Sequence, residues 1–169
     1  MVNDTVVSQI LAAGGQFVQP YINAVRQHHA HMQPLFEKYH HRAYSQGRYG
    51  ARMSWFIGKA TFRQPGTLDV TNYMTPEERR GENELLAAEY RCWRPLYNAF
   101  HQAARSSGLP AESKDQRERL EQQSGSITAE RVVNALTGSI AALSIGREPL
   151  RSAIPVTLSP TWRAEHFAR

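Results

Sequence analysis

Apolar residues recur at helical spacing in two long stretches of the second half of the chain. The first stretch begins after Thr75, Pro76 and Glu78, which have the order of a capping threonine, a first-turn proline and a third-position glutamate. We expect a helix from this capping box to about Ser106, ending before Gly108, with a kink at its internal proline. Its broad apolar face contains Leu85, Leu86, Ala88, Tyr90, Trp93, Leu96, Tyr97 and Phe100.

The second stretch, residues 128–145, is the most apolar part of the chain and predicts a core helix that ends at Gly146. The charged residues 110–123 before it predict an exposed helix or a connector. After residue 146, three prolines predict a largely extended tail, in which Ser159 and Pro160 could begin one last short helix.

The first 66 residues predict shorter and more polar helices. We expect one from Thr5 to Ala13, and a second that has Pro20 in its first turn and runs to about Tyr44, kinked or split by Pro34. A third, over residues 48–63, ends at the proline and glycine that follow. No alternating strand pattern is present. We therefore predict an all-α fold: a kinked basic helical arm, residues 1–66, followed by a small helix bundle with an extended proline-containing tail, residues 67–169.

The charge of the chain lies almost entirely in this first part. Of a net +5, residues 1–66 supply seven basic and two acidic side chains, whereas residues 67–169 contain thirteen of each. Six cations follow one another without an intervening acid: Lys38, Arg42, Arg48, Arg52, Lys59 and Arg63. In a helix, the last four would share one stripe within roughly 60° of arc. Such a row suits a line of phosphates, and the alternative is a solvated basic face.

The sequence offers little support for catalysis. Five histidines lie close together, at positions 28, 29, 31, 40 and 41, but no His-Glu-x-x-His pair or further ligand completes a metal site. We expect them to lie beside the anion-binding surface and to gain charge as the pH falls. Cys92 is the only cysteine and is expected to be an inert, half-buried thiol. We therefore predict a non-enzymatic protein without a cofactor. No signal peptide or membrane-length apolar run is visible, which predicts a soluble chain.

Two short patches of the sequence stand out, one on each side of the predicted boundary at residue 66. The first patch is Ser45, Gln46, Gly47, Arg48, Tyr49 and Gly50, followed by the basic run. The second is Val132, Val133, Asn134, Ala135, Leu136, Thr137, Gly138 and Ser139. Together they resemble the major capsid proteins of filamentous and rod-shaped double-stranded DNA viruses of archaea. The resemblance implies a basic helical arm that wraps the duplex and a helix bundle that forms the outer shell. It also implies that the six cations named above contact phosphates, and that copies of the chain, or a related second capsid protein, pair as the building block.

These observations lead to a hypothesis with two alternatives. The leading interpretation is a structural nucleoprotein that coats double-stranded DNA independently of sequence and self-assembles into a helical virion, being soluble in the host cytoplasm beforehand. The first alternative is a subunit of another large assembly, such as a phage head or ejection component or an organellar accessory subunit, which docks through its basic arm. The second is a histidine-dependent metalloenzyme.

Overall fold

The computed structural model describes residues 3–45, 74–112 and 127–146. They form four helices, in the order α1 (Asp4–Ala13), α2 (Gly15–Ser45), α4 (Pro76–Ser106) and α6 (Ala129–Ser144), and no strand occurs in these ranges. The predicted all-α fold is confirmed. The predicted helix over 48–63, the elements after residue 146 and the proposed boundary at residue 66 lie outside the described residues.

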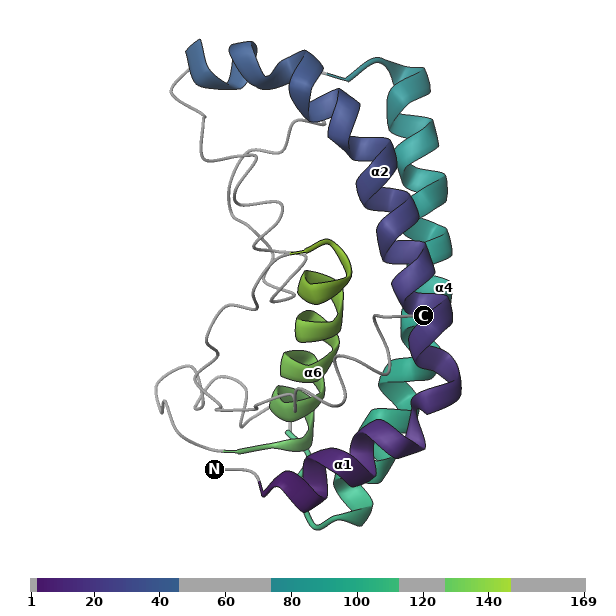
Figure 1. Cartoon of the computed structure of the whole chain (residues 1–169), viewed down its shortest axis with the longest axis vertical. Helices are drawn as coiled ribbons and strands as arrows, with labels where there is room; N and C mark the ends of the chain where they lie inside the picture. The colour runs from purple at the N-terminus through teal and green to yellow at the C-terminus, as the bar shows by residue number, and fades with distance from the viewer. Residues whose placement is uncertain (1–2, 46–73, 113–126, 147–169) are drawn as a thin grey trace.

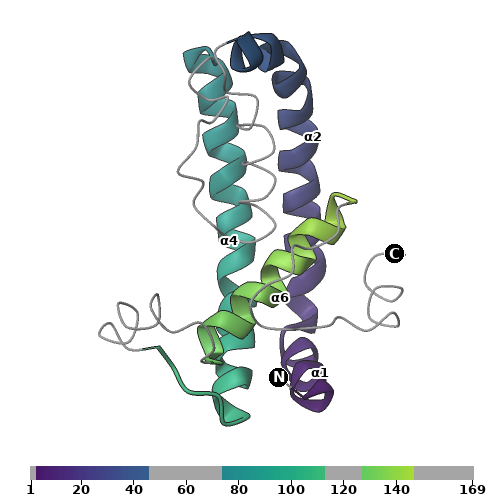
Figure 2. The same cartoon turned by 90° about the vertical axis from the view of Figure 1, so that its left-hand side faces the viewer.

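The two longest helices, α2 and α4, run antiparallel to one another, and α6 lies diagonally across both (Figures 1 and 2). The antiparallel pairing is visible in the contacts between them. Near the end of α2, Tyr39 contacts Glu78 at the beginning of α4. Earlier on α2, His28 contacts Glu89, which lies further along α4. The short helix α1 packs against the C-terminal part of α4.

The ends of α4 and α6 follow the sequence signals closely. Thr75 Oγ1 accepts a hydrogen bond from the Glu78 N–H at 3.2 Å, and the Thr75 N–H donates to Glu78 Oε1 at 3.3 Å, which confirms the capping box. Thr128 caps α6 by accepting from the Arg131 N–H. Gly108 and Gly146 follow the two helices with φ of 93° and 74°, a left-handed conformation that favours glycine at a helix end.

The predicted beginning of α2 at Pro20 is wrong, because the helix starts five residues earlier, at Gly15. Pro20 therefore interrupts the hydrogen-bond ladder inside the helix, at a cost of about 3 kcal/mol. The buried side chains of Val18, Tyr21 and Ile22 around it outweigh this cost, since each contributes about 1.5–3 kcal/mol when buried. Pro34 also lies inside α2 without splitting it, and the last turns of the helix bend away from its main axis (Figure 1).

One hydrophobic core joins all four helices, so helices from both sides of residue 66 share it. Its fully buried members include Ile10 and Ile22 from the first half, and Phe100 and Leu136 from the second. Helix α1 approaches α4 so closely that a Cβ atom on Gly14 would overlap the Phe100 ring. A smaller cluster consists of Met32, Tyr39 and Met74.

Candidate nucleic-acid interface

Of the six cations predicted to contact phosphates, two lie within the described helices. Lys38 lies on α2 with a mostly exposed side chain. Arg42 belongs to the last turns of the same helix. The other four, Arg48, Arg52, Lys59 and Arg63, lie outside the described residues, so their arrangement as one stripe stays a prediction.

Lys38 is held by an acid from the neighbouring helix. Its ammonium donates to Glu78 Oε1 at 3.3 Å and lies 5.2 Å from the centre of the Tyr39 ring. The Tyr39 hydroxyl donates to the same carboxylate oxygen at 2.6 Å. The Tyr39 bond is the main cause that lowers the pKa of Glu78 to about 2, and the capping bonds and Lys38 add to it, whereas desolvation acts in the opposite direction. The pKa of Lys38 is raised by the same two neighbours. Both groups are therefore charged at neutral pH.

A second polar cluster lies buried between α2 and α4. His28 has no exposed surface, and its Nδ1 donates to Glu89 Oε2 at 2.8 Å, while its Nε2 lies 3.5 Å from Glu82 Oε1. Both carboxylates come from α4 and are themselves only 2% and 6% exposed. This placement differs from the expectation that the histidines lie beside the surface. The reason is that His28 occupies the apolar seam of α2, at heptad spacing from Tyr21.

The same geometry excludes a metal ion shared by the three buried groups. The two carboxylates contact opposite nitrogens of the imidazole ring, so they cannot converge with one nitrogen on a single ion. No group of three or more potential ligands is placed to hold a metal anywhere in residues 3–45, 74–112 and 127–146. His31, the neighbour on the next turn, is exposed and lies near Gly81 of α4.

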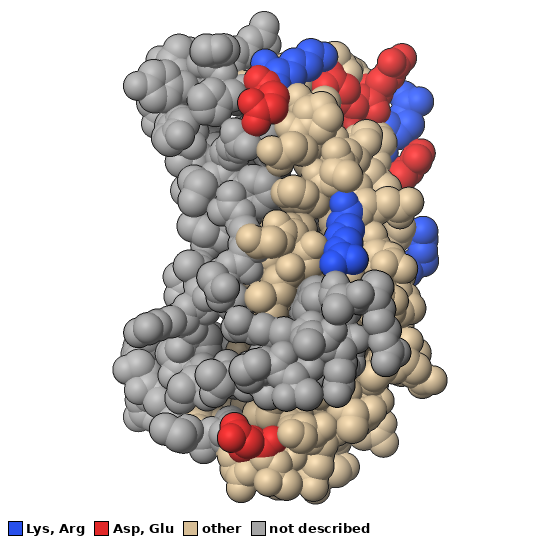
Figure 3. Space-filling view, in the orientation of Figure 1, with Lys and Arg blue, Asp and Glu red and all other residues tan. Residues whose placement is uncertain are grey.

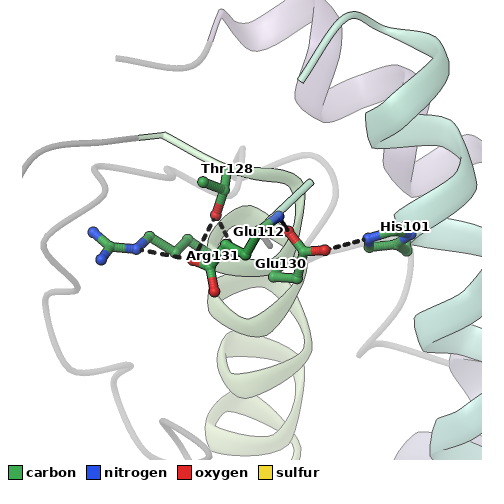
Figure 4. A network of polar contacts seen from close by, with 5 residues as sticks. All are labelled: His101, Glu112, Thr128, Glu130 and Arg131. Carbon is green, nitrogen blue, oxygen red and sulfur yellow. Dashed lines mark hydrogen bonds and ion pairs between the residues drawn. The ribbon is translucent and has the colours of Figure 1, made fainter. Parts of the chain in front are cut away.

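A third polar cluster fastens the end of α4 to the beginning of α6 (Figure 4). His101 Nε2 contacts Glu130 Oε1 at 2.8 Å, and the Glu112 N–H donates to Glu130 Oε2 at 2.8 Å. Thr128 Oγ1 and Arg131 Nε both donate to Glu112 Oε1, at 2.8 and 3.2 Å. Burial raises the pKa of Glu130, but the bonds to His101 and to the Glu112 backbone outweigh it and lower the pKa overall. The cluster stabilises the connection between the two helices.

Three of the five glutamates of α4 face α2, whereas all five of its arginines are exposed, an arrangement that sequence reasoning missed. The helix contains five arginines and five glutamates. Glu78, Glu82 and Glu89 are turned toward α2, where they make the contacts described above. All five arginines are exposed: Arg79, Arg80, Arg91, Arg94 and Arg105. At 100° per residue these positions fall within about 120° of arc, a signal that a helical wheel of residues 76–106 would have revealed.

Within the part of the chain that the structure describes, no helix combines the length and the apolar character needed to cross a bilayer. No protein-family model, no curated protein and no solved structure matches this chain.

Proposed function

We propose that this protein is a structural nucleoprotein, a viral coat protein that covers double-stranded DNA by neutralising its phosphates and assembles with copies of itself into a helical filament. The observation that carries the proposal is the run of six cations without an acid between residues 38 and 63. A row of this kind binds a phosphate backbone and does not read base sequence.

The distribution of charge over the whole chain supports this proposal. The described residues contain nine lysines and arginines and nine acids, so the helical body is neutral. The net +5 comes from the remaining residues, and residues 46–73 contribute +3 of it. A neutral body lets copies of the chain approach one another without strong repulsion, while the basic segment attracts a polyanion.

The ion pair of Lys38 does not oppose the proposal. The Lys38 side chain is 58% exposed, and an exposed pair with a carboxylate is worth little because water and salt screen it. A phosphate can therefore compete with Glu78 for the ammonium at small cost.

The test is a salt titration of binding to random-sequence double-stranded DNA, with electron microscopy of the same samples. Six phosphate contacts predict a slope of log affinity against log salt of roughly −5. Binding should be indifferent to sequence, and the bound samples should contain regular filaments.

Two variants with equal changes of net charge make the test specific. The segment variant replaces Arg48, Arg52, Lys59 and Arg63 by glutamine. The tail control replaces Arg147, Arg151, Arg163 and Arg169 by glutamine. The slope should become shallower by about 3–4 in the segment variant and should change much less in the tail control. Absence of binding at low salt would overturn the proposal and would favour the alternative, a subunit that docks its basic segment on a protein partner.

A further inference from the structure

We propose that the outer face of α4 is a second phosphate-binding surface, formed by Arg79, Arg80, Arg91, Arg94 and Arg105, which we call the arginine face. The inference rests on the proposed function in one respect, that the polyanion is double-stranded DNA. Its structural basis is separate, because it depends on described residues of α4 and on none of the six cations named from the sequence.

The first argument is the removal of acids from this face. Three of the five glutamates of α4 are occupied on the other side of the helix: Glu78 with Tyr39 and Lys38, and Glu82 and Glu89 with His28. Only Glu77 and Glu84 remain exposed on the helix. A helix with equal numbers of arginines and glutamates therefore presents five cations and two anions to solvent.

The second argument is the length and rigidity of the row. At 1.5 Å per residue, the arginine face extends roughly 39 Å along the helix from Arg79 to Arg105. The first half of α4 is held by the contacts of buried Glu82 and Glu89 with His28, and the second half by core residues such as Leu96 and Phe100, which have no exposed surface. Figure 3 shows basic side chains at intervals along the side of the molecule formed by α2 and α4, while the acidic ones gather mostly where α4 begins. A rigid row of cations loses little entropy when it meets a stiff duplex.

A third argument comes from the aromatic residues beside the row. Tyr90 is 52% exposed, and its hydroxyl accepts a hydrogen bond from Arg94 at 3.4 Å. Its ring begins a series of contacts that continues through Trp93 and Tyr97 to His101, with centroid separations of 5.6, 4.7 and 5.8 Å. At its far end, His101 contacts Glu130 in the polar cluster that joins α4 to α6. The series holds the exposed ring in place beside an arginine that can turn toward a phosphate.

Arginine suits this role better than lysine would. Its planar guanidinium binds two phosphate oxygens at once and is charged at every physiological pH. Phosphate contacts carry no information about the bases, so binding through this face should not depend on sequence.

The experiment uses the full chain and a face variant in which Arg80, Arg91, Arg94 and Arg105 are replaced by glutamine, a good helix former. Arg79 is kept. Binding to a random-sequence duplex is measured by salt titration beside the segment variant and the tail control, and far-ultraviolet circular dichroism checks that each variant is folded. The face variant should bind at least about tenfold more weakly at 0.1 M salt, with a slope shallower by about 3. Lysines at the same four positions should restore the slope to within about one unit of the wild type.

The outcomes separate this inference from the proposed function. If only the segment variant loses slope, the arginine face is not a phosphate site and the coat-protein proposal stands. If only the face variant loses slope, the sequence-derived site fails and this one stands. If the slope of the face variant falls no more than that of the tail control, net charge alone explains the change and the inference is overturned. If the wild type binds polyglutamate as tightly as the duplex and the face variant loses that binding, the face belongs to an acidic protein partner instead. Failure of the wild type to bind DNA would overturn both proposals.

Discussion

Replacing His28 by leucine should strongly destabilise the protein, although an apolar side chain would ordinarily suit this buried position. The imidazole lies between Glu82 and Glu89, which are 2% and 6% exposed, and it donates directly to the second of them. The variant leaves two buried carboxylates without the group that separates them. A carboxylate left buried without its partner costs about 3–5 kcal/mol.

The expected shift in melting temperature follows from the size of the chain. For a protein of this length, each kcal/mol corresponds to about 2–4 °C, so His28→Leu should lower Tm by roughly 6–20 °C. The triple variant that also replaces Glu82 and Glu89 by leucine should behave in the opposite way. It removes both charges together with their partner, and it should be within about 1 kcal/mol of the wild type or more stable.

The assay is thermal and urea unfolding followed by circular dichroism, with His31→Leu as the matched control. His31 lies on the same helix, one turn later, but is exposed, so its variant should differ from the wild type by less than about 0.5 kcal/mol. A His28→Leu protein that melts within 2 °C of this control, about the effect of 1 kcal/mol, would refute the reasoning. So would a triple variant that is less stable than the single one, since the buried charges would then not be the source of the cost.

Three further predictions test the packing and electrostatics of the helical body. In urea unfolding, Gly14→Ala should lower the stability by about 1–3 kcal/mol, because the added Cβ atom would overlap the Phe100 ring. Gly15→Ala should be neutral or slightly stabilising, because its Cβ atom would have no neighbour within 4 Å; equal effects of the two variants would contradict the close packing at Gly14. Tyr21→Phe should leave the stability unchanged or raise it by up to about 1 kcal/mol, because the Tyr21 hydroxyl is buried without a hydrogen-bond partner and burial raises its pKa. A clear loss of stability in urea unfolding would contradict this and would reveal a partner for the hydroxyl. Glu78 has a folded pKa of about 2 against an ordinary 4.5, so the stability that it contributes is present above pH 4.5 and is lost as the pH falls toward 2. The difference in unfolding free energy between wild type and Glu78→Gln should therefore shrink over that pH window, and a constant difference would contradict the assignment.

The fold could be predicted wherever local signals and the apolar pattern agreed. The capping box at Thr75, the cap at Thr128 and the closing glycines gave the limits of α4 and α6 to within a residue. The beginning of α2 was mispredicted because proline is a local signal, and at Pro20 tertiary packing overrides it. The burial of Val18, Tyr21 and Ile22 outweighs the one backbone hydrogen bond that proline cannot donate. Local rules have no access to this competition, because its outcome depends on α4 and α6.

The candidate site illustrates the same limit for charge. The sequence criterion, a run of cations without acids, selects residues 38–63 and passes over α4, where five glutamates are interspersed with five arginines. A polyanion, however, meets only the surface, and three of those glutamates are turned toward Lys38, Tyr39 and His28. The acids that matter are those that remain exposed, and counting them requires knowing which face of α4 packs on α2. On that count α4 has five arginines against two exposed glutamates, so a helix that is neutral in sequence is cationic toward solvent.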